Sequence, residues 1–289
     1  MEPEMRPLKK SDIPAIIEIS KTTWGGHDHL PNLIGEWLEN PVCHPYVLDA
    51  EGDVIGVANV RIIDEGRTAW LEGLRIHEKA RQKGLAQRLT NHLCDISLQL
   101  RVKRMRLVTS GDNLAPIKLA ASIGMKQMNV YQVFWKGYRR KITWRDESIK
   151  VEQIEPNNVM KFLEKNPDLL PLRALVHHWD VYDATPEKIS ELSKSAQYWG
   201  GGDDSGAVFS ISGEEPSSDG PEWIFSLFAT SPKAFTAGLS KNLEVSQESG
   251  IRNLMCIHSP NYIPMYQKIQ WLKHRNHEIS LVLHERYLE

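Results

Sequence analysis

The chain has 289 residues, 41% of them hydrophobic, with 35 Lys and Arg against 37 Asp and Glu. This length predicts two domains of ordinary size, with enough apolar residues for two cores. The balanced charge disfavours a nucleic-acid partner. No apolar run approaches the roughly 20 residues that cross a bilayer, and the N-terminus MEPEMRPLKK lacks the apolar segment of a signal peptide. We expect a cytoplasmic protein without nucleic-acid or membrane partners, acting as a monomer or homodimer.

The first half of the chain reads as alternating short helices and strands around a polar, glycine-rich loop at 24–31. Alternation of apolar and polar residues predicts the strands, and apolar residues at helical spacing predict the helices. The expected elements are, in chain order, a strand at 5–8, helices at 11–20 and 34–39, three antiparallel strands at 46–49, 54–62 and 68–76, a helix that begins near Ala86, a strand at 104–110, a helix at 113–123 and a strand at 130–135.

The period of the sequence changes within residues 70–89, where a strand gives way to a helix. Between the two lies a basic turn, 81–86, with Gly84 where a side chain would obstruct a closely bound ligand. Successive backbone N–H groups at a helix start form a site for phosphate, which basic neighbours reinforce. The turn predicts a site for a nucleotide-bearing cofactor. The alternative is an ordinary solvated helix start whose basic side chains only keep the surface hydrated.

This turn resembles the pyrophosphate signature of the GNAT acyl-CoA N-acyltransferases, which reads Gln or Arg, two residues, Gly, one residue, Gly or Ala. Arg81, Gly84 and Ala86 stand at that spacing. The segment from Asn113 to Gly124 is similar to the family's following helix, although Ala120 stands where many members carry a tyrosine general acid. The resemblance implies acetyl-CoA as co-substrate and no metal. The cofactor-binding residues that it implies are Leu74, Ile76, Arg81, Gln82, Lys83, Gly84, Leu85, Ala86, Asn113 and Lys118.

Three further segments resemble the branch of this family that contains histidine N-acetyltransferase. They are GGHDHLP at 25–31, EWL at 36–38 and LEGLRI at 71–76. That branch typically has tyrosine where His29 stands. The resemblance implies a small-molecule acceptor, a primary amine such as the α-amine of a free amino acid.

Glu72 is the candidate general base, because it is the carboxylate of the largely apolar strand 70–76. Trp70 and Leu74 are expected on its face, and partial burial would raise the pKa of this carboxyl toward a range useful near neutral pH. Backbone N–H groups near Leu74 would polarise the acetyl carbonyl as an oxyanion hole does. Alternatively, Glu72 is a plain surface charge on a solvated strand face.

Tyr131, on the strand at 130–135, is the candidate proton donor to the departing thiolate, given Ala120. We favour the alternative, in which Tyr131 is an interior or interface tyrosine.

His27, Asp28 and His29 predict a substrate loop. Asp28 could pair with a cation on the substrate, and the histidines could exchange protons near pH 7. An equally strong alternative is a loop whose polar side chains cap their own backbone. A metal site is disfavoured, because no further ligand stands at a suitable spacing. Likewise Cys43, Cys94 and Cys256 fit neither a disulfide framework nor a zinc site, and we expect buried thiols.

The second half predicts a degenerate repeat of the first. Its expected elements are strands at 149–154, 207–211, 223–229 and 251–257, helices at 158–164 and 233–247, and an exposed loop at 212–220. The corner 230–235 lacks the basic glycine signature, so this half should not bind CoA in the same way.

We therefore predict a mixed α/β fold of two tandem GNAT-like domains, a catalytic one at 1–138 and a degenerate one at 146–289 that completes the acceptor pocket. The expected reaction is acetyl transfer by direct attack of the amine in a ternary complex. The alternatives are a non-catalytic acyl-CoA sensor, or an acetyltransferase for aminoglycosides, polyamines or peptides.

Overall fold

The computed structural model describes residues 2–23, 28–217 and 220–288. The chain divides into two compact units. Unit 1 contains 1–107, 113–128 and 284–289, and unit 2 contains 108–112 and 129–283. The C-terminal residues thus join the first unit. The domain limits 1–138 and 146–289 remain a prediction.

Unit 1 is built on a sheet with the strand order β1-β2-β3-β4-β5. Neighbouring strands are antiparallel except β4 and β5, which are parallel. Its elements are β1 (Glu4–Pro7), α1 (Ile13–Ser20), α2 (Leu30–Glu39), β2 (Cys43–Ala50), β3 (Asp53–Ile63), β4 (Thr68–Ile76), α3 (Leu85–Gln99), β5 (Arg104–Ser110) and α4 (Leu114–Ser122), with short 3₁₀ turns at Lys10–Asp12 and Glu78–Ala80. The order matches the one predicted from the sequence.

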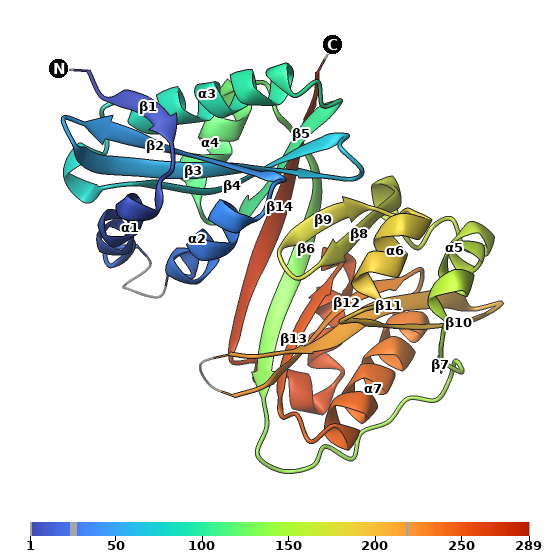
Figure 1. Cartoon of the computed structure of the whole chain (residues 1–289). Helices are drawn as coiled ribbons and strands as arrows, with labels where there is room; N and C mark the ends of the chain where they lie inside the picture. Colours follow the sequence, from blue (N-terminus) through green and yellow to red (C-terminus); the bar gives the residue numbers. More distant parts are fainter. Residues whose placement is uncertain (1, 24–27, 218–219, 289) are drawn as a thin grey trace. The chain divides into compact units, whose positions relative to one another are not determined.

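Helices cover both faces of this sheet (Figure 1). On one face α1 and α2 bury Ile16, Ile34 and Trp37 against β2 and β3. On the other, α3 and α4 bury Leu89 and Ala120. The apolar side of each helix thus packs on one of the two apolar faces that the alternation of strand side chains creates.

The last strand of the chain, β14 (His277–Tyr287), contributes its final residues to unit 1. There the Arg106 Nε donates to Glu285 Oε2 at 2.5 Å, and Arg106 Nη1 lies 3.4 Å from Asp64 Oδ2. Arg104 Nη2 also donates to Asp64, at 3.2 Å. The side chains of Arg106, Asp64 and Glu285 are at most 3% exposed. A buried network of charges therefore fastens the C-terminal strand to β5.

Unit 2 repeats the plan of unit 1. Its sheet has the order β14-β6-β13-β12-β11-β10-β7. Its elements are β6 (Lys126–Gly137, whose first residues belong to unit 1), β7 (Glu152–Gln153), α5 (Pro156–Lys165), a hairpin of β8 (Ala174–His177) and β9 (Asp180–Asp183), α6 (Pro186–Leu192), β10 (Gln197–Asp203), β11 (Gly206–Glu215), β12 (Glu222–Ala229), α7 (Pro232–Glu248) and β13 (Asn253–His258), with 3₁₀ turns at Pro171–Arg173, Pro260–Gln267 and Gln270–Leu272.

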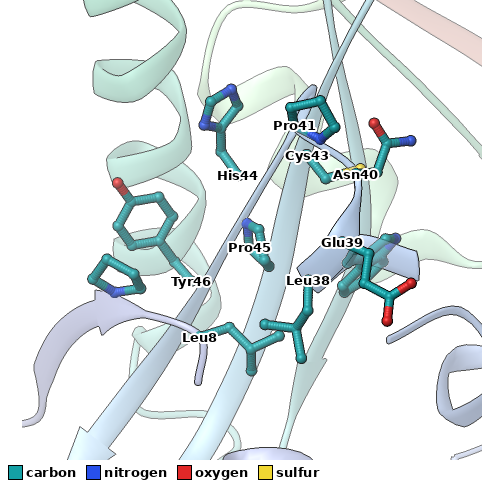
Figure 2. A pocket seen from close by; sticks show the side chains of 11 residues that line it. Leu8, Leu38, Glu39, Asn40, Pro41, Cys43, His44, Pro45 and Tyr46 are labelled. Carbon is teal, nitrogen blue, oxygen red and sulfur yellow. The ribbon is translucent and has the colours of Figure 1, made fainter. Parts of the chain in front are cut away.

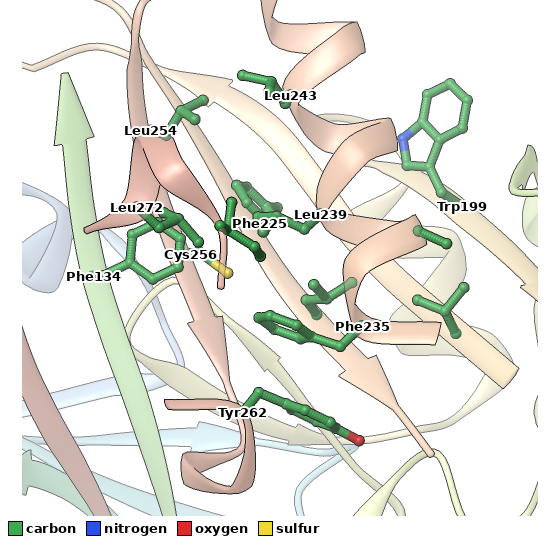
Figure 3. Close-up of a cluster of buried hydrophobic side chains, with 14 of the residues drawn as sticks. Phe134, Trp199, Phe225, Phe235, Leu239, Leu243, Leu254, Cys256, Tyr262 and Leu272 are labelled. Carbon is green, nitrogen blue, oxygen red and sulfur yellow. The ribbon is translucent and has the colours of Figure 1, made fainter. Parts of the chain in front are cut away.

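The run of antiparallel β10, β11 and β12, then α7, then parallel β13, has the same order as β2, β3, β4, α3 and β5. Helix α7 packs its apolar face on this sheet, with Phe235 and Leu239 beside Phe225 (Figure 3). Helices α5 and α6 cover the opposite face, where Tyr198 donates to the Ile189 carbonyl. The mixed α/β fold with a second, degenerate unit is thereby confirmed.

Some details of unit 2 differ from the prediction. Residues 212–215 continue β11 rather than opening a loop, because the buried Ser212 hydroxyl accepts a hydrogen bond from Trp199 Nε1 at 3.1 Å. The strand expected at 149–154 shrinks to β7. Elements β8, β9, α6, β10 and β14 were not predicted. Finally, no helix in the described part of the chain is both long and apolar enough to span a bilayer.

Candidate functional site

Strand β4 carries a β-bulge next to Glu72. Its ladder with β3 pairs Glu72 with Asn59 and Arg75 with Val57, so Gly73 and Leu74 together oppose Ala58. Gly73 is left-handed, with φ +68°, as a glycine bulge requires. The extra residue shifts the side-chain alternation. Glu72 and Arg75 therefore share the face of α1 and α2, whereas Leu74 packs with the core under α3. The expectation that Leu74 shares the face of Glu72 is wrong for this reason.

Glu72 is held by two residues of β3. Asn59 Nδ2 donates to Glu72 Oε1 at 2.8 Å, and Arg61 donates to Oε2 through Nη2 at 3.1 Å. The side chains of Arg61 and Glu72 are 18% and 19% exposed. The Glu72 carboxylate is therefore held by an amide and a guanidinium while part of its side chain stays exposed. Trp70 is buried beside the pair, as predicted.

Replacing Gly73 by Ala should destabilise unit 1 by about 2 to 3 kcal/mol. An added Cβ would lie 2.0 Å from Trp37 Cη2, on a backbone already left-handed. Urea unfolding followed by tryptophan fluorescence measures the loss. The matched control is Gly35→Ala on α2, where a Cβ meets nothing within 4 Å. That variant should gain about 0.5 to 1 kcal/mol. Equal stability of the two variants would contradict the bulge argument.

Strand β4 pairs with β5 over a short stretch. In the ladder that the structure describes, Thr68, Ala69 and Trp70 are the residues of β4 that pair with β5. The residues from Leu71 to Ile76 thus lie beyond the paired part of the two parallel strands. Ligands of open α/β sheets bind at the carboxyl ends of such strands, and here that end carries Glu72, Leu74 and Ile76.

The corner from β4 to α3 has the geometry of an anion site. Gly84 is the N-cap of α3, left-handed at φ +73°, and no side chain caps this helix end. Gln82 is left-handed as well, and Arg81 Nε donates to the Ile76 carbonyl at 3.1 Å. Residues 81–84 are exposed. No side chain therefore caps the first N–H groups of α3, at Leu85 and Ala86.

A negative charge at Gly84 should weaken acetyl-CoA binding by roughly tenfold to a hundredfold. Gly84→Asp places a carboxylate where we expect pyrophosphate, and Gly84→Asn adds nearly the same volume without charge. Both residues tolerate the left-handed conformation better than other side chains. Calorimetric titration with CoA compares the two variants. Equal CoA affinities of the Gly84→Asp and Gly84→Asn variants would show that the corner does not bind the pyrophosphate.

Asn113 is the N-cap of α4 in unit 1, and Lys118 lies within that helix with its side chain exposed. Asn113 provides no side-chain cap for that helix. Ala120 is fully buried in the core under α3. Their roles toward a cofactor remain predictions.

Asp28 is anchored to strand β4. Its carboxylate accepts from Arg75 Nε and Nη2, both at 2.8 Å, and from the Leu30 N–H at 3.1 Å. Burial alone would raise the pKa of Asp28, but the Arg75 guanidinium and the Leu30 N–H hold it below its usual value. The chain thus supplies its own cation to this carboxylate. His29 is the exposed N-cap of α2, and His27 lies outside the described residues.

Tyr131 lies in unit 2, on β6, whereas Glu72 lies in unit 1. The Tyr131 side chain is buried and lines a cavity of unit 2. Unit 2 also differs at its own strand-to-helix corner. The Ser231 hydroxyl caps α7 by accepting from the Ala234 N–H, and Pro232, without an N–H, is in the first turn. This helix end is therefore closed to an anion.

His258 makes the stability of unit 2 depend on pH. It is buried, with Nδ1 donating to the Ser259 carbonyl at 2.7 Å, so Nε2 must accept from the Tyr266 hydroxyl. Burial lowers its pKa to about 4. The unfolded imidazole binds a proton near pH 6.5, so the unfolded chain holds more protons between pH 6.5 and 4.

Stability should therefore fall by about 2 to 3 kcal/mol as the pH decreases from 7 to 4 through His258 alone. Urea unfolding at several pH values measures the slope. His258→Gln removes the titrating group, and its slope should be shallower by that amount. An unchanged slope would show that His258 does not carry the effect.

The sequence argument missed Asn59, Arg61 and Arg75. Asn59 and Arg61 were visible as polar residues two apart in an apolar strand, which places them on one face. Among the described residues, no three His, Cys, Asp or Glu side chains gather as a metal site. The three cysteines are buried free thiols, as predicted.

A hollow of about 320 Å³ lies in unit 1 at the end of α2 (Figure 2). Leu38, Glu39, His44 and Tyr46 are part of its lining. Glu72 and Gly84 do not line it. It is therefore a separate feature of unit 1 from the strand-to-helix corner.

Comparison with known proteins gives a family and a set of relatives. Residues 13–125 match the model of the acetyltransferase (GNAT) family. Histidine N-acetyltransferase of Xenopus tropicalis is 28% identical over 201 residues, which cover 64% of this chain and 61% of that relative. Histidine N-acetyltransferase of Scomber australasicus is 30% identical over 150 residues, covering 51% and 42%. The matches thus span about two fifths to three fifths of the relatives' length.

Solved structures share the fold along the whole chain. A tandem GNAT protein from the clavulanic acid biosynthesis pathway covers 99% of this chain and 98% of its own, with a TM-score of 0.59 and 13% identity. A GCN5-related N-acetyltransferase from Sphaerobacter thermophilus covers 99% and 95%, with a TM-score of 0.63 and 12% identity. These likenesses concern the fold, and they agree with two tandem units.

Proposed function

We propose that this chain, whose residues 13–125 match the model of the acetyltransferase (GNAT) family, transfers an acetyl group from acetyl-CoA to a primary amine. The acceptor that we propose is the α-amine of a free amino acid such as histidine. One observation carries the proposal: Glu72 stands beside a glycine bulge on the strand that leads into an uncapped helix start.

The corner at Gly84 fits the pyrophosphate of acetyl-CoA. A Cβ at Gly84 would meet nothing within 4 Å, so the backbone is open to close approach. The N–H groups of Leu85 and Ala86 would donate to phosphate oxygens, and the exposed Arg81 and Lys83 would add positive charge. Bound there, acetyl-CoA would supply the thioester. The N–H groups near Leu74 would polarise its carbonyl.

Glu72 would take the proton that the attacking amine must lose. The amine nitrogen forms a bond to the acetyl carbon, the carbon–sulfur bond breaks, and the thiolate leaves with the electron pair. Asn59 and Arg61 hold the carboxylate in one orientation. A charged carboxylate can accept the proton directly or through a water. For Tyr131, which lies in unit 2 and lines a cavity there, we keep the alternative of an interior tyrosine.

Charge on the face of α1 and α2 supports a free amino acid as acceptor. Arg61 and Arg75 share this face with Glu72, and their side chains are 18% and 16% exposed. An amino acid presents both an amine and a carboxylate, and guanidinium groups bind carboxylates well. In this proposal Asp28 positions Arg75, and His29 lies at the mouth of the acceptor site.

The acceptor class is tested with purified protein, acetyl-CoA, and a panel of amino acids, polyamines, aminoglycosides and peptides. We expect product from amino acids, with histidine among the best. Activity confined to peptides or polycations would contradict the proposal that the acceptor is a free amino acid. Tight CoA binding without any product would favour a non-catalytic acyl-CoA sensor, the alternative that the buried Ala120 leaves open.

A further inference from the structure

Unit 2 contains a cavity of about 340 Å³ at the carboxyl ends of its parallel strands β12 and β13. Its wall is formed by the ends of both strands, by Tyr131 of β6 and by the segment around Asp168. Cavities of this size hold small organic ligands, and the carboxyl ends of parallel strands are where open α/β sheets bind them. The cavity lies wholly within unit 2 and shares no residue with the predicted cofactor corner.

The cavity presents buried polar groups among apolar ones. The Ser226 side chain is 2% exposed, and its hydroxyl has no hydrogen-bond partner among the described residues. A buried hydroxyl without a partner costs free energy, which a ligand can recover by bonding to it. The Tyr131 side chain lines the same space, and Leu227 and Phe228 supply apolar surface. The lining therefore suits a molecule with an apolar body and a polar end.

The charge of the cavity lining decides which polar group of a ligand can bind there. Asp168 is the charged residue of the described lining, which contains no Lys or Arg. His258 also lines the cavity, but its imidazole is neutral at pH 7 because burial lowers its pKa to about 4. A carboxylate without a competing cation attracts an ammonium group and disfavours an anion.

CoA does not fit this cavity. Its pyrophosphate would need the helix start of α7, but the Ser231 hydroxyl already bonds to the Ala234 N–H at 3.2 Å. Pro232 supplies no N–H there. The Gly206 position also packs closely on Ser231, since an added Cβ would lie 2.4 Å from its Oγ. The degenerate unit has thus lost the phosphate site while keeping a cavity at the strand ends.

We propose that this cavity is a second binding site, specific for a small organic monoamine with an apolar body. The ammonium group pairs with the Asp168 carboxylate at the mouth. The polar groups of the ligand bond to the Ser226 and Tyr131 hydroxyls, and its body packs on Leu227 and Phe228. The site is independent of acetyl transfer in unit 1.

The test is calorimetric titration of the full chain, without acetyl-CoA, using tyramine and its uncharged analogue 4-ethylphenol. Ser226→Ala should weaken tyramine binding up to about tenfold. The matched control is Ser97→Ala, another buried serine, on α3 of unit 1.

Asp168→Asn tests the charge at the mouth. It should weaken tyramine binding up to about fivefold and leave 4-ethylphenol binding unchanged. Asp204→Asn, an exposed acid outside the cavity, is its control.

Circular dichroism checks that each variant is folded, and Tyr131→Phe replaces Ser226→Ala if the latter is not. Tyramine binding that survives both lining substitutions unchanged would overturn the proposal, as would its absence from the wild-type chain. Displacement of tyramine by CoA would also overturn it, because it would place the amine in unit 1. None of these results depends on acetyl transfer, so the two proposals can fail separately.

Discussion

Glu72→Gln should lower kcat for acetyl transfer by about 10²- to 10⁴-fold, the usual contribution of a positioned general base. Glutamine keeps the size of the side chain and can still accept from Asn59, but it cannot take the proton of the amine. Arg61 would lose its charged partner, so its guanidinium would lie 18% exposed beside a neutral amide. Initial rates at saturating acetyl-CoA measure the loss.

Acetyl-CoA affinity should change little in Glu72→Gln, because the corner at Gly84 is separate from this side chain. Glu36→Gln, an exposed carboxylate on α2, is the matched control and should keep wild-type turnover. If the turnover of Glu72→Gln stays within about twofold of wild type, Glu72 is not the base.

Glu285→Gln should destabilise unit 1 by about 3 to 5 kcal/mol, the cost of removing one partner from a buried ion pair. Glu285 accepts from Arg106 at 2.5 Å, and both side chains are at most 3% exposed. Asp64 lies farther from Arg106, at 3.4 Å, and is shared with Arg104. Asp64 would still be shared by both guanidinium groups, without the help of Glu285. Urea unfolding of the full chain gives the free energy of unfolding.

The double variant Glu285→Met with Arg106→Met separates charge from packing. Replacing both members of a buried pair by apolar residues is often neutral or stabilising. We expect it to recover most of the stability that Glu285→Gln loses. A double variant as unstable as the single one would show that the ion pair itself, or the fit of its side chains, cannot be replaced by apolar contact.

Local patterns predicted much of the fold and the cofactor corner. The bounds of β4 and β5 were predicted as the structure has them, because apolar side chains recur along both segments. Gly84 and the basic turn were recognisable because a helix start needs only adjacent residues to present its N–H groups. The repeat in unit 2 followed from the same elements recurring in the same order.

The contacts that arrange the site could not be predicted from local patterns. Trp37 packs where a side chain at Gly73 would lie, a contact that links α2 to β4. Asp28 meets Arg75 across 47 residues of sequence, and Arg106 meets Glu285 across 179. Such pairs follow from the three-dimensional packing of the sheet. For that reason the face of Leu74 was misplaced, and the guanidinium groups around Glu72 went unnoticed.

The reaction that we propose for unit 1 is the transfer of acetyl from acetyl-CoA to a free amino acid. Its most direct test is mass spectrometry of a reaction that contains the full chain, acetyl-CoA with an isotope-labelled acetyl group, and a mixture of free amino acids including histidine. We predict a labelled Nα-acetyl amino acid, with Nα-acetylhistidine prominent, in an amount equal to the free CoA released. Acetyl-CoA that binds the chain but leaves every amino acid unlabelled would contradict the claim.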